Sequence, residues 1–154
     1  MSKELLKNKI EELINQASFT IDSCEITEEG GTFWCAIRTP DSRFLIGRDG
    51  EALRSFNHII KKIMDKELGE EVSPQIMIDI NGYQRKRMES LKATAHMLAE
   101  RARYFKSSVE ADPMPAFERK IIHMYLEKEK DITTESKGEG RDRRIVIKYI
   151  DERI

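Results

Sequence analysis

Apolar and polar positions in the first half of the chain predict helices and strands in a definite order. An opening helix is predicted over residues 3–17, and strand-like runs follow at residues 19–26 and 32–37. After residue 50 the apolar positions fall at three-and-four spacing, as on one face of a helix, at Leu53, Phe56, Ile59, Ile60 and Ile63. Isoleucines then alternate through residues 75–80, which predicts a strand. The expected order is therefore helix, strand, strand, helix, helix, strand.

The second half has a longer helical pattern, followed by signals for a small sheet. From residue 84 apolar residues repeat at three-and-four spacing, at Met88, Leu91, Ala95, Leu98, Ala102 and Phe105. Prolines extend residues 109–115, and a shorter helix is predicted over residues 116–127. The apolar face of this shorter helix consists of Phe117, Ile121 and Met124. Strand-like runs at residues 132–136 and 144–149, joined by a glycine-containing reversal, predict a hairpin.

A short glycine loop precedes the second predicted helix of the first half. Its sequence is Gly47-Arg48-Asp49-Gly50, preceded by Ile46 and followed by Arg54 in the helix. Glycine lacks the Cβ that keeps a sugar-phosphate chain away, and amide groups at a helix start carry partial positive charge. Gly-x-x-Gly is also common in ordinary turns, so the surrounding sequence decides what it means.

Arg119 and His123 form a second candidate site in the helix over residues 116–127. They lie four residues apart and therefore share one face. A guanidinium binds a phosphate through two hydrogen bonds, and an imidazole donates one or stacks on a base. Arg143 and Arg144 stand at the start of the last predicted strand. Arg-x-x-x-His alone is frequent in helices, so it too depends on its context.

Charge is distributed unevenly although the formal net charge is only -1. Residues 1–83 hold 10 Lys+Arg against 15 Asp+Glu, whereas residues 84–154 hold 17 against 13. The long helix contributes Arg85, Lys86, Arg87, Lys92, Arg101 and Arg103 to the basic half. A basic half attracts a polyanion, and an acidic half keeps that attraction from becoming indiscriminate. The alternative is an ordinary solvated surface.

Other features of the composition indicate a cytoplasmic protein. No stretch approaches the roughly 18 apolar residues of a membrane helix, and we expect no membrane insertion. The first residues do not resemble a secretion signal. Cys24 and Cys35 lie in adjacent strand-like segments without Cys-x-x-Cys or nearby histidines, so we expect reduced thiols. No cofactor, metal ion or small-molecule substrate is expected.

These motifs together resemble a known pairing of domains. Residues 1–82 resemble a type II (bacterial) KH domain with Gly47-Arg48-Asp49-Gly50 as its GXXG loop. The block from Asp112 to His123, with residues 134–140 and 143–147, resembles the R-three-H domain, named for Arg-x-x-x-His. KH followed directly by this domain resembles the Jag (SpoIIIJ-associated) family of bacterial proteins over essentially the whole chain.

The resemblance implies an α+β fold in which a long helix joins the two domains. The KH domain is expected over residues 1–82, with the order helix, strand, strand, helix, helix, strand. The R-three-H domain is expected over residues 83–154, including the linking helix, with helices on a small, mainly antiparallel sheet. The extra N-terminal domain of many family members is expected to be missing.

The resemblance also implies a single-stranded nucleic-acid binder. RNA is the expected ligand and single-stranded DNA the alternative. The implied role is post-transcriptional regulation linked to cell elongation, the envelope or sporulation, and the implied partner protein is a small KH-only protein. The expected nucleic-acid contacts are Ile46, Gly47, Arg48, Asp49, Gly50, Arg54, Arg119, His123, Arg143 and Arg144. Asp49 departs from the family pattern, in which a basic residue would be expected there.

Two other classes of function compete with this interpretation. In a protein-interaction adaptor both folds would serve as scaffolds, and the acidic first half with Asp49 favours this alternative. An enzyme has little support, because no Gly-Lys-Ser/Thr follows the glycine loop and the three histidines are far apart in sequence. The sequence therefore predicts a binding protein without catalytic residues.

Overall fold

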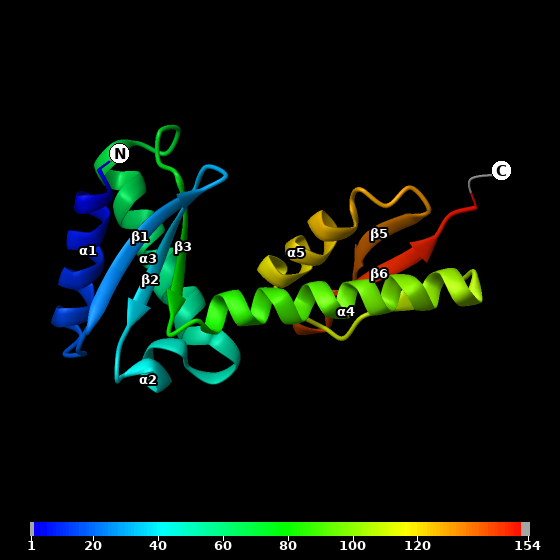
Figure 1. The fold of residues 1–154 in the computed structure, drawn as a ribbon, viewed down its shortest axis with the longest axis horizontal. Helices are drawn as coiled ribbons and strands as arrows, with labels where there is room; N and C mark the ends of the chain where they lie inside the picture. Colours follow the sequence, from blue (N-terminus) through cyan, green and yellow to red (C-terminus); the bar gives the residue numbers. More distant parts are fainter. Residues whose placement is uncertain (1, 152–154) are drawn as a thin grey trace. The chain divides into compact units, whose positions relative to one another are not determined.

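The computed structural model describes residues 2–151 of a chain with an α+β fold in two compact units (Figure 1). The first unit comprises Met1–Arg85 and the second Lys86–Ile154. Each unit contains one three-stranded sheet and its own apolar core.

The first unit follows the order of elements predicted from the sequence. Its elements are α1 (Lys3–Gln16), β1 (Ser23–Glu29), β2 (Thr32–Arg38), α2 (Ser42–Ile46), the 3-10 turn η1 (Arg48–Gly50), α3 (Glu51–Leu68) and β3 (Gln75–Ile80). The sheet has the order β1-β2-β3, with β1 antiparallel and β3 parallel to the central strand β2. The parallel pair requires a crossover, and α2 and α3 supply it.

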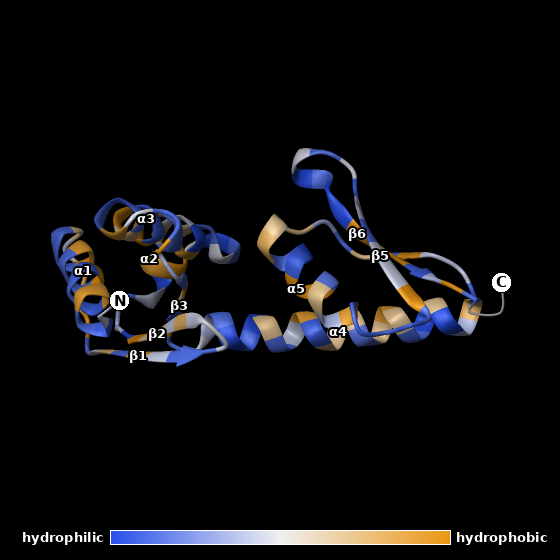
Figure 2. Cartoon of the chain, turned by 90° about the horizontal axis from the view of Figure 1, so that it is seen from above, coloured by the Kyte–Doolittle hydropathy of each residue, from blue (hydrophilic) through white to orange (hydrophobic). Residues whose placement is uncertain are grey.

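Helices cover one face of this sheet (Figure 2). Alternate residues of β2 and β3 point toward the helices because successive strand side chains face opposite sides. The buried apolar residues of β2 and β3 are Phe33, Cys35, Ile37, Ile76, Ile78 and Ile80, and they pack with Leu6, Ile10, Ile14, Leu53, Phe56, Ile60 and Met64 of the helices. On the other face, the Arg85 guanidinium lies 4.1 Å from the centroid of the Trp34 ring.

Two details of the first unit differ from the prediction. β1 begins at Ser23 rather than at residue 19, because the backbone of Thr20 is hydrogen-bonded to side chains of residues 39 and 41 instead of to a strand. Ile59 is 46% exposed, while Met64 is fully buried. The apolar stripe of α3 therefore passes through Leu53, Phe56, Ile60 and Met64.

The second unit is built on a long helix and an antiparallel sheet. Its elements are α4 (Tyr83–Phe105), β4 (Val109–Glu110), α5 (Ala116–Leu126), β5 (Ile132–Lys137), the 3-10 turn η2 (Gly140–Asp142) and β6 (Arg144–Tyr149). The sheet order is β4-β6-β5, and both strand pairs are antiparallel. The predicted hairpin is β5 and β6. The two-residue strand β4, in the segment expected to be merely extended, was not predicted.

The division between the units falls within the first turn of α4. We predicted a boundary after Gly82, whereas the first compact unit extends to Arg85. The side chains explain the difference. Tyr83 packs on the first core, and the Gln84 amide donates to Asp79 Oδ1 at 2.9 Å. Arg85 forms an ion pair with Glu29, with 2.6 Å between nitrogen and oxygen.

The core of the second unit lies between α4, α5 and the sheet. Its buried residues include Leu91, Ala95, Leu98, Ala99, Ala102, Ile121, Ile122, Leu126, Ile145 and Ile147. Two residues that we expected on packed faces are instead largely exposed. Phe105, at the end of α4, is 64% exposed, and Met124 of α5 is 58% exposed.

No helix among residues 2–151 combines the length and apolar character needed to cross a bilayer. Both cysteines are free and buried. Burial raises the pKa of Cys24 to about 11 and that of Cys35 to about 12, so both thiols stay protonated near neutral pH.

Candidate nucleic-acid interface

The loop between α2 and α3 requires glycine at its first position for two reasons. Gly47 has φ +70°, in the region that side chains rarely adopt. A Cβ placed on Gly47 would lie 2.7 Å from the Ala52 Cβ and 3.0 Å from the Ala52 backbone nitrogen. The loop backbone thus runs directly against the first turn of α3. The half-buried Ile46 ends α2 and packs on the first core.

The last glycine of the loop lies under the first turn of α4. Gly50 is buried, with φ +76°. A Cβ there would lie 3.2 Å from both Cε1 and the hydroxyl oxygen of Tyr83, and 3.4 Å from Nη1 of Arg54. The ring of Tyr83 therefore packs closely against the end of the loop.

Arg54 is part of the same support. Its Nη1 donates a hydrogen bond to the carbonyl oxygen of Asp49 at 2.8 Å. Asp49 has φ +53°, so this bond holds a residue in the left-handed region, which aspartate tolerates better than most side chains. This bond uses one of the five N–H groups of the guanidinium, so Arg54 helps to position the loop, and our prediction that it contacts nucleic acid stays a prediction.

The two side chains at the loop tip differ from Arg54 in having no internal partner. Arg48 and Asp49 are exposed, and neither side chain has a polar partner among the described residues. The loop tip therefore presents one free cation and one free anion. Their opposite charges partly offset each other toward a phosphate.

In the second unit, β5 brings together residues from α5 and from the β5–β6 connection. His123 of α5 shares a hydrogen bond between its Nδ1 and the hydroxyl of Thr134. Arg143 donates from Nε to the Ser136 hydroxyl at 2.9 Å. Thr134 and Ser136 are two residues apart in β5 and therefore face the same side. His123 and Arg143 are thus held next to each other.

Arg119 is anchored at the start of the same helix. It lies one turn before His123 and donates from Nη1 to the carbonyl oxygen of Met114 at 2.7 Å. This bond uses one of the five N–H groups of the guanidinium. Arg119, His123 and Arg143, which we call the β5 cluster, are therefore assembled in one region of the second unit.

Arg144 does not belong to the β5 cluster. Its guanidinium lies 3.7 Å from a carboxylate oxygen of Glu110 in β4, and its Nε donates to the Asp142 carbonyl oxygen. Arg143 bonds to Ser136, whereas Arg144 is paired with Lys137, and these neighbouring residues of β5 face opposite sides. The prediction treated the two arginines alike. Sequence reasoning also passed over Arg141 in η2, which is exposed and has no polar partner among residues 2–151.

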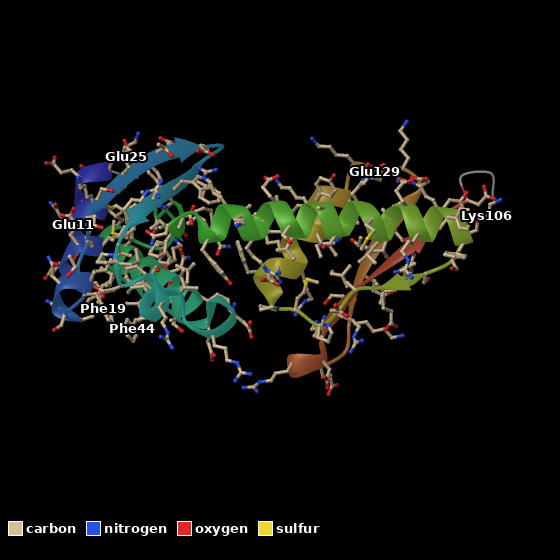
Figure 3. All side chains as sticks on the ribbon, turned by 60° about the horizontal axis from the view of Figure 1, so that its bottom comes forward. Glu11, Phe19, Glu25, Phe44, Lys106 and Glu129 are labelled. Carbon is tan, nitrogen blue, oxygen red and sulfur yellow. The ribbon has the colours of Figure 1, made fainter. Side chains whose placement is uncertain are left out.

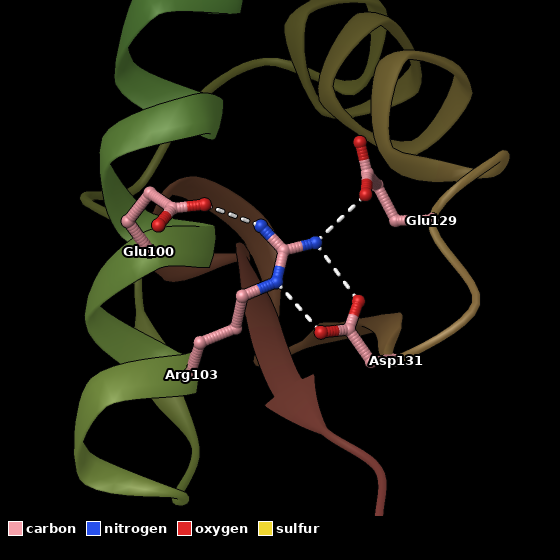
Figure 4. Close-up of polar contacts among 4 residues, drawn as sticks. All are labelled: Glu100, Arg103, Glu129 and Asp131. Carbon is pink, nitrogen blue, oxygen red and sulfur yellow. Dashed lines mark hydrogen bonds and ion pairs between the residues drawn. The ribbon is translucent and has the colours of Figure 1, made fainter. Parts of the chain in front are cut away.

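Most cations of α4 take part in ion pairs within the units. Arg87 makes two hydrogen bonds of 2.8 Å to the buried carboxylate of Glu118. Arg103 contacts Glu100, Glu129 and Asp131 (Figure 4). These hydrogen bonds raise the pKa of Arg103, Asp131 being the largest cause, and Arg103 lowers the pKa of Asp131. These arginines therefore connect α4 to α5 and to the segment before β5.

Comparison with known proteins identifies the second unit. Residues 89–149 match the R-three-H domain family. The chain is 28% identical to the RNA-binding protein KhpB of Clostridium symbiosum over 150 residues, which cover 94% of this chain and 67% of that protein. It is 34% identical to KhpB of Bacillus subtilis over 107 residues, covering 68% of this chain and 50% of that protein. For KhpB of Lactiplantibacillus plantarum the identity is 29%, covering 71% of this chain and 33% of that protein. The chain thus spans between a third and two thirds of these relatives.

Proposed function

The chain belongs to the Jag (KhpB) family of proteins with an R-three-H domain, and from this premise we propose that it binds single-stranded RNA. The observation that carries the proposal is the β5 cluster. Arg119, His123 and Arg143 lie together within the part of the chain that matches the R-three-H domain. Their donors suit a phosphate backbone, and the exposed imidazole also offers a surface for a base.

We propose in addition that the first unit is a type II KH domain. The order of its elements, the parallel pairing of β2 with β3 and the position of the glycine loop between α2 and α3 all support this assignment. In this proposal Arg48 and the amide groups at the start of α3 attract phosphate, while Arg54 and Tyr83 fix the loop. Binding at two domains on one chain raises the overall affinity, because the second encounter is intramolecular.

The wider role that we propose is post-transcriptional regulation in the bacterial cytoplasm. Cell elongation, envelope regulation and sporulation are the processes that the family resemblance suggests. A small KH-only protein is the partner it suggests, and single-stranded DNA is the alternative nucleic acid.

Fluorescence anisotropy with a labelled pool of short single-stranded RNAs tests the proposal. We expect saturable binding at low salt that weakens as salt increases, since phosphate contacts release counterions. Arg48→Glu and Arg119→Ala should each weaken it. Lys66→Glu is the matched control for Arg48, because it reverses an exposed charge at the other end of α3, which is 18 residues or about 27 Å long. Absence of saturable binding by the wild-type protein at low salt would reject RNA binding.

An adaptor function is favoured by one specific observation. Asp49 presents an unpaired carboxylate at the tip of the loop, in a unit with more acidic than basic residues. An adaptor would show the same weak RNA affinity for the wild-type protein, Arg48→Glu and Arg119→Ala. Unequal affinities of these three proteins would therefore argue against it.

A further inference from the structure

Two phenylalanine rings form an ordered pair beside the glycine loop. The rings of Phe19 and Phe44 are 5.9 Å apart between centroids, with 15° between their planes, and Figure 3 labels both. Phe19 is half-buried against the first core, whereas Phe44 of α2 is 64% exposed. Parallel rings at this separation are offset, so the pair leaves much of the Phe44 ring open to solvent.

Hydrogen bonds hold the segment of Phe19 in place next to α2. The Thr20 amide donates to Oδ2 of Asp41 at 2.8 Å, and the Thr20 carbonyl accepts from the Thr39 hydroxyl at 2.5 Å. The Asp41 amide in turn donates to the Thr39 hydroxyl oxygen at 3.0 Å. Both polar backbone groups of Thr20 are thus bonded to the segment that leads into α2. The position of Phe19 against Phe44 is therefore fixed by the fold and not by the ring contact alone.

Phe44 lies close to the loop proposed to contact phosphate. It precedes Gly47 by three residues, which is less than one helical turn and about 4.5 Å along the axis. Arg43 and Arg48, on either side in the sequence, are exposed, and their side chains have no polar partner among the described residues. An RNA chain held at the loop would therefore place a neighbouring nucleotide within reach of an exposed ring that has a free arginine on either side in the sequence, with the Asp49 carboxylate next to Arg48.

We propose that Phe44 is a stacking platform for a nucleobase of single-stranded RNA, with Phe19 as the residue that positions its ring. The inference rests on the proposed function of the loop and extends it from phosphate contact to base contact. Stacking on an aromatic ring tolerates any base, since every base has a π face. An ordered ring loses little further freedom when a base covers it, which favours binding.

Substitutions at Phe44 test the platform in the anisotropy assay. Phe44→Ala should weaken binding of the RNA pool about tenfold, the effect typical of losing one base–aromatic stack. Phe44→Trp should retain wild-type affinity or exceed it. Phe105→Ala is the matched control, because Phe105 is also 64% exposed and also contacts another aromatic ring, that of Tyr104. The Phe105→Ala variant should bind the RNA pool with wild-type affinity.

An abasic oligonucleotide of the same length separates stacking from other effects. Wild type and Phe44→Ala should bind it equally, because it offers phosphates without bases. Equal affinity of Phe44→Ala and wild type for the RNA pool would overturn the platform, as would an equal loss on the abasic chain. If Arg48→Glu weakens binding in the same experiment while Phe44→Ala does not, the platform fails and the loop proposal stands. If the wild-type protein does not bind the pool, the proposed function itself fails.

Discussion

The aromatic ring of Tyr83 lies against Gly50, so that a Cβ added to this glycine would be 3.2 Å from the Tyr83 hydroxyl oxygen. Tyr83 is the first residue of α4, and Gly50 is the last residue of the loop. This contact joins the start of the long helix to the proposed phosphate-binding backbone. It makes the conformation of the loop depend on a residue far away in the sequence.

Gly50→Ala should lower the free energy of unfolding of the first unit by about 1–2 kcal/mol for the left-handed conformation, plus about 0.5–1 kcal/mol for the close contact with the Tyr83 ring. The cost should be about 0.5–1 kcal/mol smaller when Tyr83 is also replaced by alanine, because the contact with the ring is then removed. Urea unfolding followed by tryptophan fluorescence measures these free energies of unfolding, since the only tryptophan, Trp34, lies in the first unit. Strictly additive costs would contradict the contact.

Gly47→Ala should destabilise the first unit more than Gly31→Ala. Both residues have positive φ, +70° and +80° respectively, but an added Cβ meets the first turn of α3 only at Gly47. No atom lies within 4 Å of a Cβ added to Gly31. The difference in the free energy of unfolding between the two variants separates the steric cost of the added Cβ from the cost of a positive φ. We expect this difference to be about 1–3 kcal/mol. Equal destabilisation in the same fluorescence measurement would show that the loop backbone relaxes freely.

The order of elements was predictable because hydrophobic spacing records which face of each element is buried. The exposure of Ile59 and Phe105 was not predictable from spacing. The apolar stripe on each helix is wider than the area that the rest of the unit covers, so residues at its edge stay exposed. The start of β1 depends on Thr39 and Asp41, which are distant in sequence from Thr20. Hydrogen bonds between residues far apart in the sequence cannot be predicted from local hydrophobic patterns.

In the candidate site, too, features set by local spacing were predictable, whereas contacts between residues far apart in the sequence were not. The i,i+4 spacing of Arg119 and His123 indicates a shared face without the structure. The internal hydrogen bond of Arg54 and the ion pair of Arg144 with Glu110 depend on the folded backbone and on residues from another strand. The same holds for the pairing of Phe44 with Phe19, which joins α2 to the segment after α1.

His123→Ala should weaken RNA binding about tenfold to 150-fold, the effect of losing a hydrogen bond to a charged phosphate. Thr134→Val should cause a smaller loss, because it removes only the hydroxyl that orients the imidazole. Met124→Ala, at an exposed neighbour on α5, is the control and should bind as the wild type does. Anisotropy measures the affinities, and circular dichroism checks that the helix content of the protein is unchanged. Wild-type affinity of His123→Ala would remove the imidazole from the proposed site.

Arg103→Gln should destabilise the second unit near neutral pH by no more than about 1 kcal/mol, because the carboxylates around it are partly exposed. Arg103 lowers the pKa of Asp131 below its usual value near 3.8, mainly through hydrogen bonding. The stabilisation is therefore complete above about pH 4 and is lost as the pH falls through the lowered pKa. Amide hydrogen exchange in β5 should show a difference between variant and wild type at pH 7 that shrinks in acid. A constant difference across this range would mean that Asp131 does not contribute.

Asp49→Asn should strengthen RNA binding about twofold to fivefold at low salt. The substitution removes a free negative charge beside Arg48 while keeping a residue type that tolerates the left-handed φ of +53°. Since the effect is electrostatic and at the surface, it should diminish as the salt concentration rises. Glu70→Gln is the control, because it removes an exposed charge that has no polar partner among the described residues just beyond the far end of α3. An affinity gain equal for both variants would reflect net charge alone, whereas a gain confined to Asp49→Asn would place the phosphate at the glycine loop.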